Sequence, residues 1–268
     1  LEDWLGVPLF ERRARGVALT DEGAEFLADT TQAFARLTAA TEKVRRPEVR
    51  RVSGLLRVNV LPSFALRWLL PRLAQFHAMF PNIEVRLSTT SRRLRYIGQA
   101  FDVGVRSGSE QAPGLRSETL MPDRRRPACS PQVLHRRPIE TAQDLSRHTL
   151  LHSVSTRSAW PHWLAAAGAP ELSPARHVEL EHVYLQLQAA VDGLGVALAS
   201  MPLIEADLAA GRLVCPLAVE WHAPSYQLVI NEDRARDDAV RAFRKWIVAE
   251  ARAETRHPDA AHAADLRK

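Results

Sequence analysis

The sequence predicts an α/β fold in which parallel strands alternate with covering helices. Short apolar runs typical of buried strands alternate with amphipathic stretches from Gly54 onward. A second set of alternating segments follows Pro127, and a separate long helix is expected ahead of both sets. Alternation of this kind is typical of a parallel sheet covered by helices, because the apolar face of each element must be buried against another element.

The long helix is predicted at residues 20–46. Thr20 is a favoured N-cap residue, and Asp21 and Glu22 place negative charge in the first turn, where the helix dipole favours it. Pro47 ends the helix. Small and apolar residues recur at heptad spacing and form a narrow stripe suited to another helix, although packing on the chain's own domain is an equal alternative. The stripe consists of Ala24, Leu27, Thr31, Phe34, Thr38 and Thr41.

The first alternating set predicts strands joined by helices. Ser63 is expected to cap the helical region after the first strand, and Pro71 fits the first turn of a second helical piece. We expect strands at residues 55–61, 82–90 and 101–108, and helices at residues 62–81 and 91–100.

The second alternating set repeats the pattern and ends in an amphipathic helix. The last residues, 251–268, lack periodicity and are expected to be a disordered tail. We expect strands at residues 148–153, 175–183, 195–200 and 225–231, and helices at residues 158–168, 184–193, 202–211 and 237–251.

Composition narrows the class of protein without naming a function. The 268 residues carry a net charge of +5, which is compatible with an anionic partner, although charge clusters are usually solvated surface. Cys129 and Cys215 lie far apart, which argues against a disulfide scaffold or a zinc ribbon and favours buried thiols in a reducing compartment. No apolar run reaches the ~18 residues of a membrane span. We therefore expect a cytoplasmic protein that contacts no membrane.

Candidate catalytic motifs have better structural interpretations. Gly193 and Gly195 lie between a predicted helix and a predicted strand, whereas a dinucleotide site needs the order strand, glycines, helix. A helix end and a tight turn are therefore favoured. The histidines at His177 and His182 lack a metal-ligand spacing, and no serine has a recognisable base partner. We expect no enzyme activity, no metal and no cofactor.

Polar residues recur where predicted strands end. Ser63 follows the first strand, Thr89 and Thr90 end the second, Arg106 lies near the end of the third, and His152 lies near the end of the first strand in the second set. The carboxyl ends of parallel strands border the crevice in which open α/β sheets bind ligands, and helix N-termini there attract anions. Each hydroxyl alone is better explained as an N-cap. Together they predict a binding cleft without a nucleophile.

The residues resemble those of the LysR-type transcriptional regulators. The first stretch carries Leu5-Gly6, Leu9-Phe10, Arg12, Leu19-Thr20 and Gly23, which resemble the segment from the end of the DNA-recognition helix through the wing into the linker helix. The segments PSFALRWLLPRLAQFHAMFPNIEVRLSTT, FDVGVRSG, PGLRSETL, PACSPQVL and GLGVALAS resemble the branch of glycine-cleavage and β-lactamase activators. The resemblance extends from residue 1 to about residue 250.

This resemblance implies a two-lobed effector domain like a type II periplasmic binding protein, preceded by a winged-helix remnant and a linker helix. It also implies two crossings between the lobes, near Pro127–Ser130 and near Ser225–Leu228. The implied parts are residues 1–19 (remnant of the winged helix-turn-helix), 20–46 (dimerisation helix), 54–126 with 226–250 (first subdomain), 127–225 (second subdomain) and 251–268 (tail).

The resemblance further implies roles for particular residues. Arg12, Arg13 and Arg15 of the wing would face DNA. The effector-binding positions would be Ser63, Phe64, Thr89, Thr90, Arg106, His152 and Val196. The expected partners are DNA through the full-length parent, a small, possibly anionic effector, further copies of the chain in a dimer or tetramer, and RNA polymerase.

The first two helices and most of the recognition helix of the family have no counterpart in this sequence. Wing arginines position a protein on DNA but carry little sequence information, so we expect this chain alone not to bind an operator specifically. Three alternatives remain open: an exported solute-binding protein of the same fold, an enzyme on a similar fold, and a redox sensor that uses Cys129 and Cys215.

Overall fold

The computed structural model describes residues 1–13, 16–45, 52–94, 97, 100–108 and 110–255. The chain divides into two compact units, of which the first ends at Gly54 and the second begins at Leu55. Each unit has its own helices and strands.

The first unit contains a short helix, a hairpin and a long helix, which are α1 (Glu2–Leu5), β1 (Phe10–Arg13), β2 (Gly16–Leu19) and α2 (Asp21–Arg45). The carboxylate of Glu2 accepts hydrogen bonds from the backbone N–H groups of Leu9 (2.6 Å) and Phe10 (3.0 Å), which ties α1 to the start of the hairpin. The strands pair antiparallel from Phe10 opposite Leu19 to Arg13 opposite Gly16. A short β-hairpin therefore lies where the sequence predicts a wing.

The long helix begins as expected. The Thr20 hydroxyl oxygen accepts a hydrogen bond from the N–H of Gly23 at 2.9 Å, which confirms Thr20 as the N-cap. A Cβ atom on Gly23 would lie 2.0 Å from the carbonyl oxygen of Leu9, so only glycine fits where the helix meets the hairpin. Leu27 and Phe34 of the heptad stripe are 52% and 70% exposed, whereas the side chains of Thr38 and Thr41 lie outside the description.

The second unit is built on one sheet of eight strands in the order β4-β3-β5-β10-β6-β9-β7-β8. The pairs β3–β5, β7–β8 and β7–β9 are parallel. The predicted parallel pairing is therefore confirmed at these places and wrong at the centre, where β6 and β10 run antiparallel to their neighbours. The strands are β3 (Gly54–Val60), β4 (Ile83–Thr89), β5 (Val103–Ser107), β6 (Leu115–Ala128), β7 (Thr149–Ser153), β8 (Arg176–Leu180), β9 (Val196–Ser200) and β10 (Trp221–Asn231).

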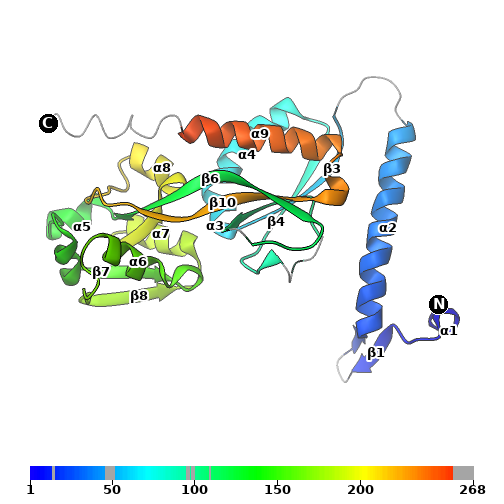
Figure 1. Ribbon diagram of the computed structural model, residues 1–268, viewed down its shortest axis with the longest axis horizontal. Helices are drawn as coiled ribbons and strands as arrows, with labels where there is room; N and C mark the ends of the chain where they lie inside the picture. Colours follow the sequence, from blue (N-terminus) through cyan, green and yellow to red (C-terminus); the bar gives the residue numbers. More distant parts are fainter. Residues whose placement is uncertain (14–15, 46–51, 95–96, 98–99, 109, 256–268) are drawn as a thin grey trace. The chain divides into compact units, whose positions relative to one another are not determined.

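Strands β6 and β10 join two halves of the second unit and are visible as long ribbons side by side in Figure 1. β3, β4 and β5 lie in the first half, and β7, β8 and β9 in the second. The pairing of β10 with β6 is irregular between Ala223 and Tyr226, where one half gives way to the other. The crossings implied near Pro127–Ser130 and Ser225–Leu228 fall at the end of β6 and within β10, respectively.

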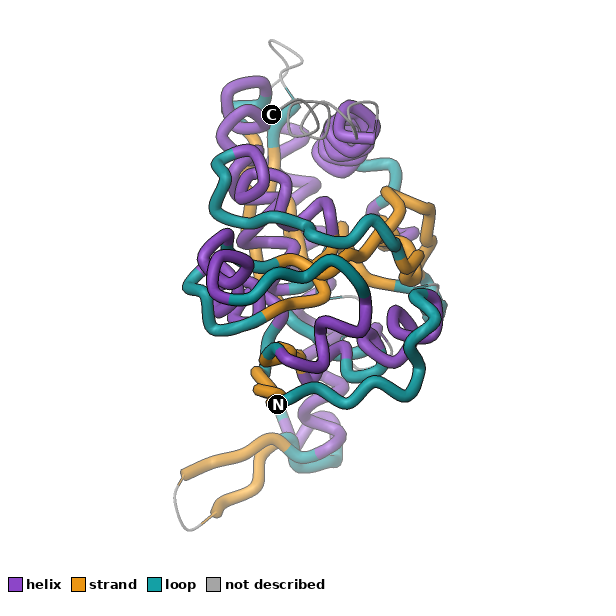
Figure 2. Tube along the Cα trace, turned by 90° about the vertical axis from the view of Figure 1, so that its left-hand side faces the viewer, coloured by secondary structure: helices purple, strands orange, loops and turns teal. Residues whose placement is uncertain are grey.

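Helices flank these strands (Figure 2). In the first half the rings of Phe76, Phe243 and Trp246 lie 5.0–5.3 Å apart and pack α4 against α9. In the second half Trp160 and Trp163 of α6 belong to the buried core. The helices are α3 (Pro62–Phe64), α4 (Leu70–Met79), α5 (Pro131–Arg136), α6 (Ala159–Ala166), α7 (Val183–Val191), α8 (Met201–Ala209) and α9 (Asp238–Thr255), with shorter segments η1 (Ala65–Leu69), η3 (Ala142–Arg147), η4 (Val154–Thr156) and η5 (Glu232–Arg234).

The local predictions for Ser63 and Pro71 have different outcomes. Ser63 is not a cap: Leu61 occupies the N-cap position, Pro62 lies at the start of α3, and Ser63 follows inside the helix. Pro71 does lie in the first turn of α4, as predicted. The helix expected at residues 91–100 includes Arg95, Tyr96, Gly98 and Gln99, which lie outside the described residues. The tail expected at residues 251–268 begins too early, because α9 continues to Thr255; residues 256–268 lie outside those described.

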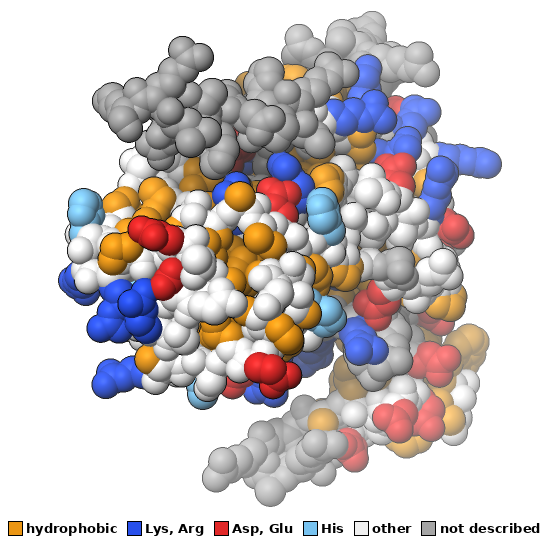
Figure 3. Space-filling view, turned by 60° about the vertical axis from the view of Figure 1, so that its left-hand side comes forward, with side chains coloured by type: hydrophobic (Ala, Val, Ile, Leu, Met, Phe, Trp, Pro, Cys, Tyr) orange, Lys and Arg blue, Asp and Glu red, His pale blue; other side chains and the backbone are white. Residues whose placement is uncertain are grey.

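The surface of the second unit has an ordinary mixture of side chains. On the face in Figure 3, hydrophobic side chains lie in the middle and charged side chains lie around them. Apolar atoms contribute more than half of a typical protein surface, so this distribution alone identifies no binding face. A more specific feature of this unit is a cavity between its two halves.

Candidate ligand-binding site

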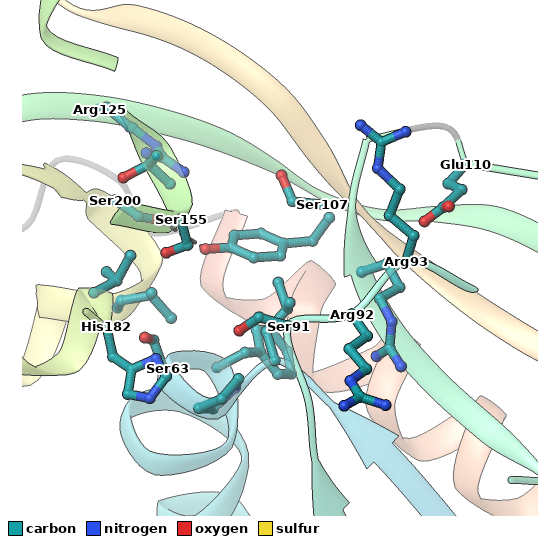
Figure 4. Close-up of a pocket in the computed structure, with 18 of the residues that line it drawn as sticks. Ser63, Ser91, Arg92, Arg93, Ser107, Glu110, Arg125, Ser155, His182 and Ser200 are labelled. Carbon is teal, nitrogen blue, oxygen red and sulfur yellow. Dashed lines mark hydrogen bonds between the residues drawn. The ribbon is translucent and has the colours of Figure 1, made fainter. Parts of the chain in front are cut away.

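A cavity of about 460 Å³ opens between the two halves of the second unit (Figure 4). Ser155, His182 and Ser200 of the second half lie on the opposite side from Arg92 and Arg93 of the first half. The crossing strands β6 and β10 contribute Arg125 and Tyr226. Both halves and both crossing strands therefore form its walls.

Arg106 is a buried cation in the cavity wall. Its side chain is 3% exposed, and its Nη1 donates to the carbonyl oxygens of Asn59 (3.0 Å) and Val105 (2.8 Å). Its Nη2 donates to the side-chain oxygen of Asn59, while its Nε is buried without a hydrogen-bond partner. Burial lowers the pKa of Arg106 to about 10, although the charge of Glu110 opposes this shift. These acceptors are neutral, so the guanidinium charge is incompletely balanced.

Ser63 and Phe64 enter the cavity from the short helix α3, directly after β3. The ring of Phe64 stacks on Trp68 at 4.8 Å and lies 5.3 Å from the ring of Tyr226. Ser63 is 8% exposed. The floor of the cavity is therefore aromatic and rigid, with one buried hydroxyl group on it.

Where β9 and β10 border the cavity, two hydroxyl groups lie close together that the sequence did not indicate. Ser200 Oγ and the phenolic oxygen of Tyr226 are 3.2 Å apart and buried. Arg125 also lies there, but Asp123 holds it through two hydrogen bonds of 3.0 and 2.8 Å. Ser200 ends β9 and could have been found by the strand-end pattern that pointed to Ser63. Tyr226 lies within a strand and gave no such signal.

The mouth of the cavity is basic. Arg92 and Arg93 line it in a segment held by two backbone contacts. The N–H of Arg92 donates to Thr90 Oγ1 at 3.1 Å, and the N–H of Leu94 donates to a carboxylate oxygen of Glu110 at 3.0 Å. With Arg106, these residues bring three guanidinium groups and the carboxylate of Glu110 into the lining, and the fourth arginine, Arg125, is paired with Asp123, so this part of the lining carries a net positive charge.

Four of the implied effector-binding residues do not line this cavity. Thr89 is exposed at the end of β4, and Thr90 instead accepts the hydrogen bond from Arg92. The ring of His152 lies against Trp160 and His177. Val196 is fully buried in the core of the second half. Ser63, Phe64 and Arg106 do line the cavity.

Comparisons with known proteins agree with this architecture. A family model described as the LysR substrate binding domain matches residues 50–252. The glycine cleavage system transcriptional activator of Escherichia coli K12 is 39% identical over 256 residues, which cover 95% of this chain and 83% of that protein. The transcriptional activator AmpR of Pseudomonas aeruginosa is 34% identical over 257 residues, which cover 96% of this chain and 85% of that protein. This chain belongs to the LysR-type transcriptional regulators.

The solved effector domain of the AmpR protein of Pseudomonas aeruginosa matches this LysR-type chain with a TM-score of 0.65 and 33% identity. The match covers 76% of this chain and 98% of that domain. The predicted two-lobed fold class is therefore confirmed, and so is the function as a transcriptional regulator with an effector-binding domain. The relatives are transcriptional activators, which supports this function over that of an exported solute-binding protein.

Further predictions for this LysR-type chain concern the DNA-binding wing, the helix end at Gly193, metal binding and membrane contact. Arg12 and Arg13 lie on β1, but their side chains and all of Arg15 lie outside the description, so DNA contact by the wing stays a prediction. Gly193 has a φ of 78° after α7, which confirms the predicted helix end. Among the described residues, no three His, Cys, Asp or Glu side chains form a group that could hold a metal. Over the same part of the chain, no helix has the length and apolarity to span a membrane.

The two cysteines are poorly suited to redox sensing. Both are free thiols, and Cys129 is fully buried. Burial raises the pKa of Cys129 to about 12 and that of Cys215 to about 11. The thiolate is the reactive form of cysteine, so both thiols are expected to be inert at neutral pH.

We expect iodoacetamide at neutral pH to leave both thiols of the folded chain unmodified, and to modify both in urea. Because the raised pKa values belong to the folded state, reactivity of the folded chain should increase only as the pH approaches 11. Mass spectrometry of the alkylated chain at several pH values measures this. Alkylation of folded Cys215 at the rate of a free cysteine near pH 8 would contradict the expectation.

Proposed function

We propose that the cavity binds a small anionic effector, and that binding changes how the halves of the second unit are held. Arg106 is the observation that carries this proposal. Its guanidinium group is buried against neutral acceptors and has an unpartnered Nε in the cavity wall. A bound carboxylate or phosphate would supply the missing negative charge, and charge-assisted hydrogen bonds are the strong ones.

The remaining lining residues fit an anion with an apolar body. Ser63, Ser91 and Ser107 add hydroxyl donors, and Arg92 and Arg93 attract negative charge to the mouth. Leu61, Phe64, Leu198 and Leu203 offer apolar contact. A cavity of about 460 Å³ lies in the size range of sites for small molecules.

A thermal-shift screen of the chain tests the proposal. Mono- and dicarboxylates and phosphate monoesters should raise the melting temperature in a saturable way, because a ligand that binds only the folded state stabilises it. Their methyl esters or neutral analogues serve as matched controls and should not raise it. The binder found in this way should lose affinity in Ser63→Ala. Equal stabilisation by charged and neutral analogues, or an unchanged affinity of Ser63→Ala for every anion, would overturn the proposal.

The exposure of Leu27 and Phe34 on α2 supports dimerisation through this helix. We expect Leu27→Asp combined with Phe34→Asp to shift the chain toward monomer, because two charges would be buried in a helix–helix seam. Sedimentation velocity over a concentration series measures the shift. Leu66→Asp, which alters a 49% exposed leucine of the second unit, is the control. An unchanged association of the double variant would contradict α2 as the dimer contact.

The biological setting follows from the family. As a LysR-type regulator the protein is proposed to act in the cytoplasm, without catalysis, through DNA binding that needs a complete helix-turn-helix. Contact with RNA polymerase is part of the same proposal, because the relatives are activators. Gel-shift experiments that compare this chain with a version carrying a complete helix-turn-helix test whether operator binding needs that motif. Tight, sequence-selective binding by this chain alone at physiological salt would contradict this requirement.

A further inference from the structure

A partly buried ion pair connects the two halves of the second unit. Arg67 lies in η1 of the first half, and Asp207 lies in α8 of the second half. Arg67 Nη1 is 2.6 Å from Asp207 Oδ2, and the two side chains are 16% and 3% exposed. This contact joins the halves independently of the crossing strands β6 and β10.

The pair lies one helical turn from the cavity on each side. Phe64 precedes Arg67 by three residues, and Leu203 precedes Asp207 by four; Phe64 and Leu203 both line the cavity. Because a helical turn contains about 3.6 residues, each member of the pair is attached through a single turn to a cavity wall. Movement of the two walls away from each other would therefore draw Arg67 away from Asp207.

Asp207 has a second cationic partner that belongs to its own half. Arg212 contacts Asp207 Oδ1 at 2.7 Å through Nη2 and at 2.8 Å through Nε. Breaking a buried ion pair is costly mainly because one charge is left buried without a partner. Here Asp207 would keep Arg212, and Arg67, which is already partly exposed, would gain water. The pair can therefore open at a smaller cost than an isolated buried pair.

The region around Arg67 also departs from regular helix. Residues Ala65–Leu69 form a π-helical segment between α3 and α4. Such segments are rare and occur frequently at functional sites. Arg72, in the next turn, lies 3.4 Å from Glu205 of α8, but Glu205 is 51% exposed, so this contact is weak beside the buried one.

We propose that Arg67 and Asp207 form a latch that holds the halves in the closed arrangement of the cavity and thereby sets its affinity for the effector. The role in affinity rests on the proposed function. The closure itself is a property of the ligand-free chain and is measured without any ligand. Loss of the proposed anion binding would leave the measurement of closure unaffected.

Pulsed electron paramagnetic resonance on the full 268-residue chain tests the latch. Spin labels are attached to Gln75→Cys in α4 and Ala165→Cys in α6, two exposed positions in different halves. Labelled chain is diluted with unlabelled chain so that distances within one copy are measured. Cys129 is buried, Cys215 is half-buried, and the thiol pKa values of both are raised, so the native cysteines should not compete for the label.

Arg67→Met should shift the distance distribution toward longer values, whereas Arg67→Lys should retain the short distance. Arg212→Met is the matched control, because it removes the other cation from the same carboxylate without disconnecting the halves; its distribution should equal that of the unmodified chain. Arg67→Gln carries the same expectation as Arg67→Met and replaces it if the methionine variant does not fold by circular dichroism. An unchanged distribution in Arg67→Met or Arg67→Gln overturns the latch. Equal shifts in Arg67→Met and Arg212→Met overturn it as well, since they would reduce the pair to a structural role.

Discussion

Arg106→Met is expected to weaken binding of an anionic effector about 10- to 100-fold, since a hydrogen bond to a charged group contributes about 1.5–3 kcal/mol. Methionine has about the length of the aliphatic stem of arginine and no charge, so the change removes the guanidinium group and keeps the volume of the stem. The measurement is isothermal titration calorimetry with the anion that best stabilises the unmodified chain in the thermal-shift screen. Arg86→Met is the control: Arg86 lies on β4, is exposed, and pairs with Glu84.

The lowered pKa of Arg106 is the reason why a loss of affinity for the anion is expected from this arginine and not from the exposed Arg86. Burial favours the uncharged form, so below about pH 10 the folded chain holds the charged guanidinium at a free-energy disadvantage relative to the unfolded chain. A basic group whose folded-state pKa is lowered destabilises the fold at neutral pH, and the disadvantage disappears as the pH rises through the folded-state value. An anion beside Arg106 would reverse this disadvantage. Unaltered affinity of Arg106→Met for the anion would contradict a role for this residue in binding.

Arg67→Met and Arg106→Met should differ in the distances between the halves. Arg106 donates its hydrogen bonds within the first half, to Asn59 and Val105. The variant Arg106→Met is therefore expected to leave the spin-label distances unchanged. Arg67 pairs across the halves with Asp207. The two arginines therefore separate ligand recognition from closure of the cavity.

The strand-end argument found part of the candidate site from sequence alone. Ser63 and Arg106 follow or end strands of the first half, and the cavity does open at these strand ends. His152 was chosen by the same argument and does not line the cavity. The segment η4 follows β7, and two of its residues, Ser155 and Thr156, line the cavity instead. The position after the strand was right, but a turn of helix moved the contact beyond the strand itself.

Periodicity did not predict the crossing strand β6, and it predicted β10 only over residues 225–231. β6 has the sequence LRSETLMPDRRRPA, in which charged residues interrupt the apolar ones, and its burial alternates irregularly. Its strand structure depends on pairing with β10, whose paired residues lie 96 to 116 residues later in the chain. Tyr226 lies beside the irregular part of that pairing, so its position in the cavity depends on a register that no local pattern encodes. Short strands flanked by helices were predictable because each carries its own apolar signal.

Gly195→Ala is expected to lower the free energy of unfolding of the second unit by about 3 kcal/mol, at the upper end of the range for overpacking. A Cβ atom on Gly195 would lie 2.3 Å from the carbonyl oxygen of Thr149, where β9 meets β7. The obstacle is backbone, which cannot rotate away as a side chain can. Because β9 also carries Leu198 and Ser200 into the cavity, the strand must shift as a whole or separate from β7.

Gly193→Ala gives the matched comparison within the same short segment. Gly193 has a φ of 78°, and its Cβ would approach Ser130 Oγ no closer than 3.3 Å, so the penalty is conformational and about 1–2 kcal/mol. Urea denaturation followed by tryptophan fluorescence measures both variants, since five of the six tryptophans lie in the second unit. A smaller effect of Gly195→Ala than of Gly193→Ala would contradict the close approach of β9 to β7. The two glycines thus have two separate structural reasons, a helix end and a strand contact, and their spacing needs no nucleotide to explain it.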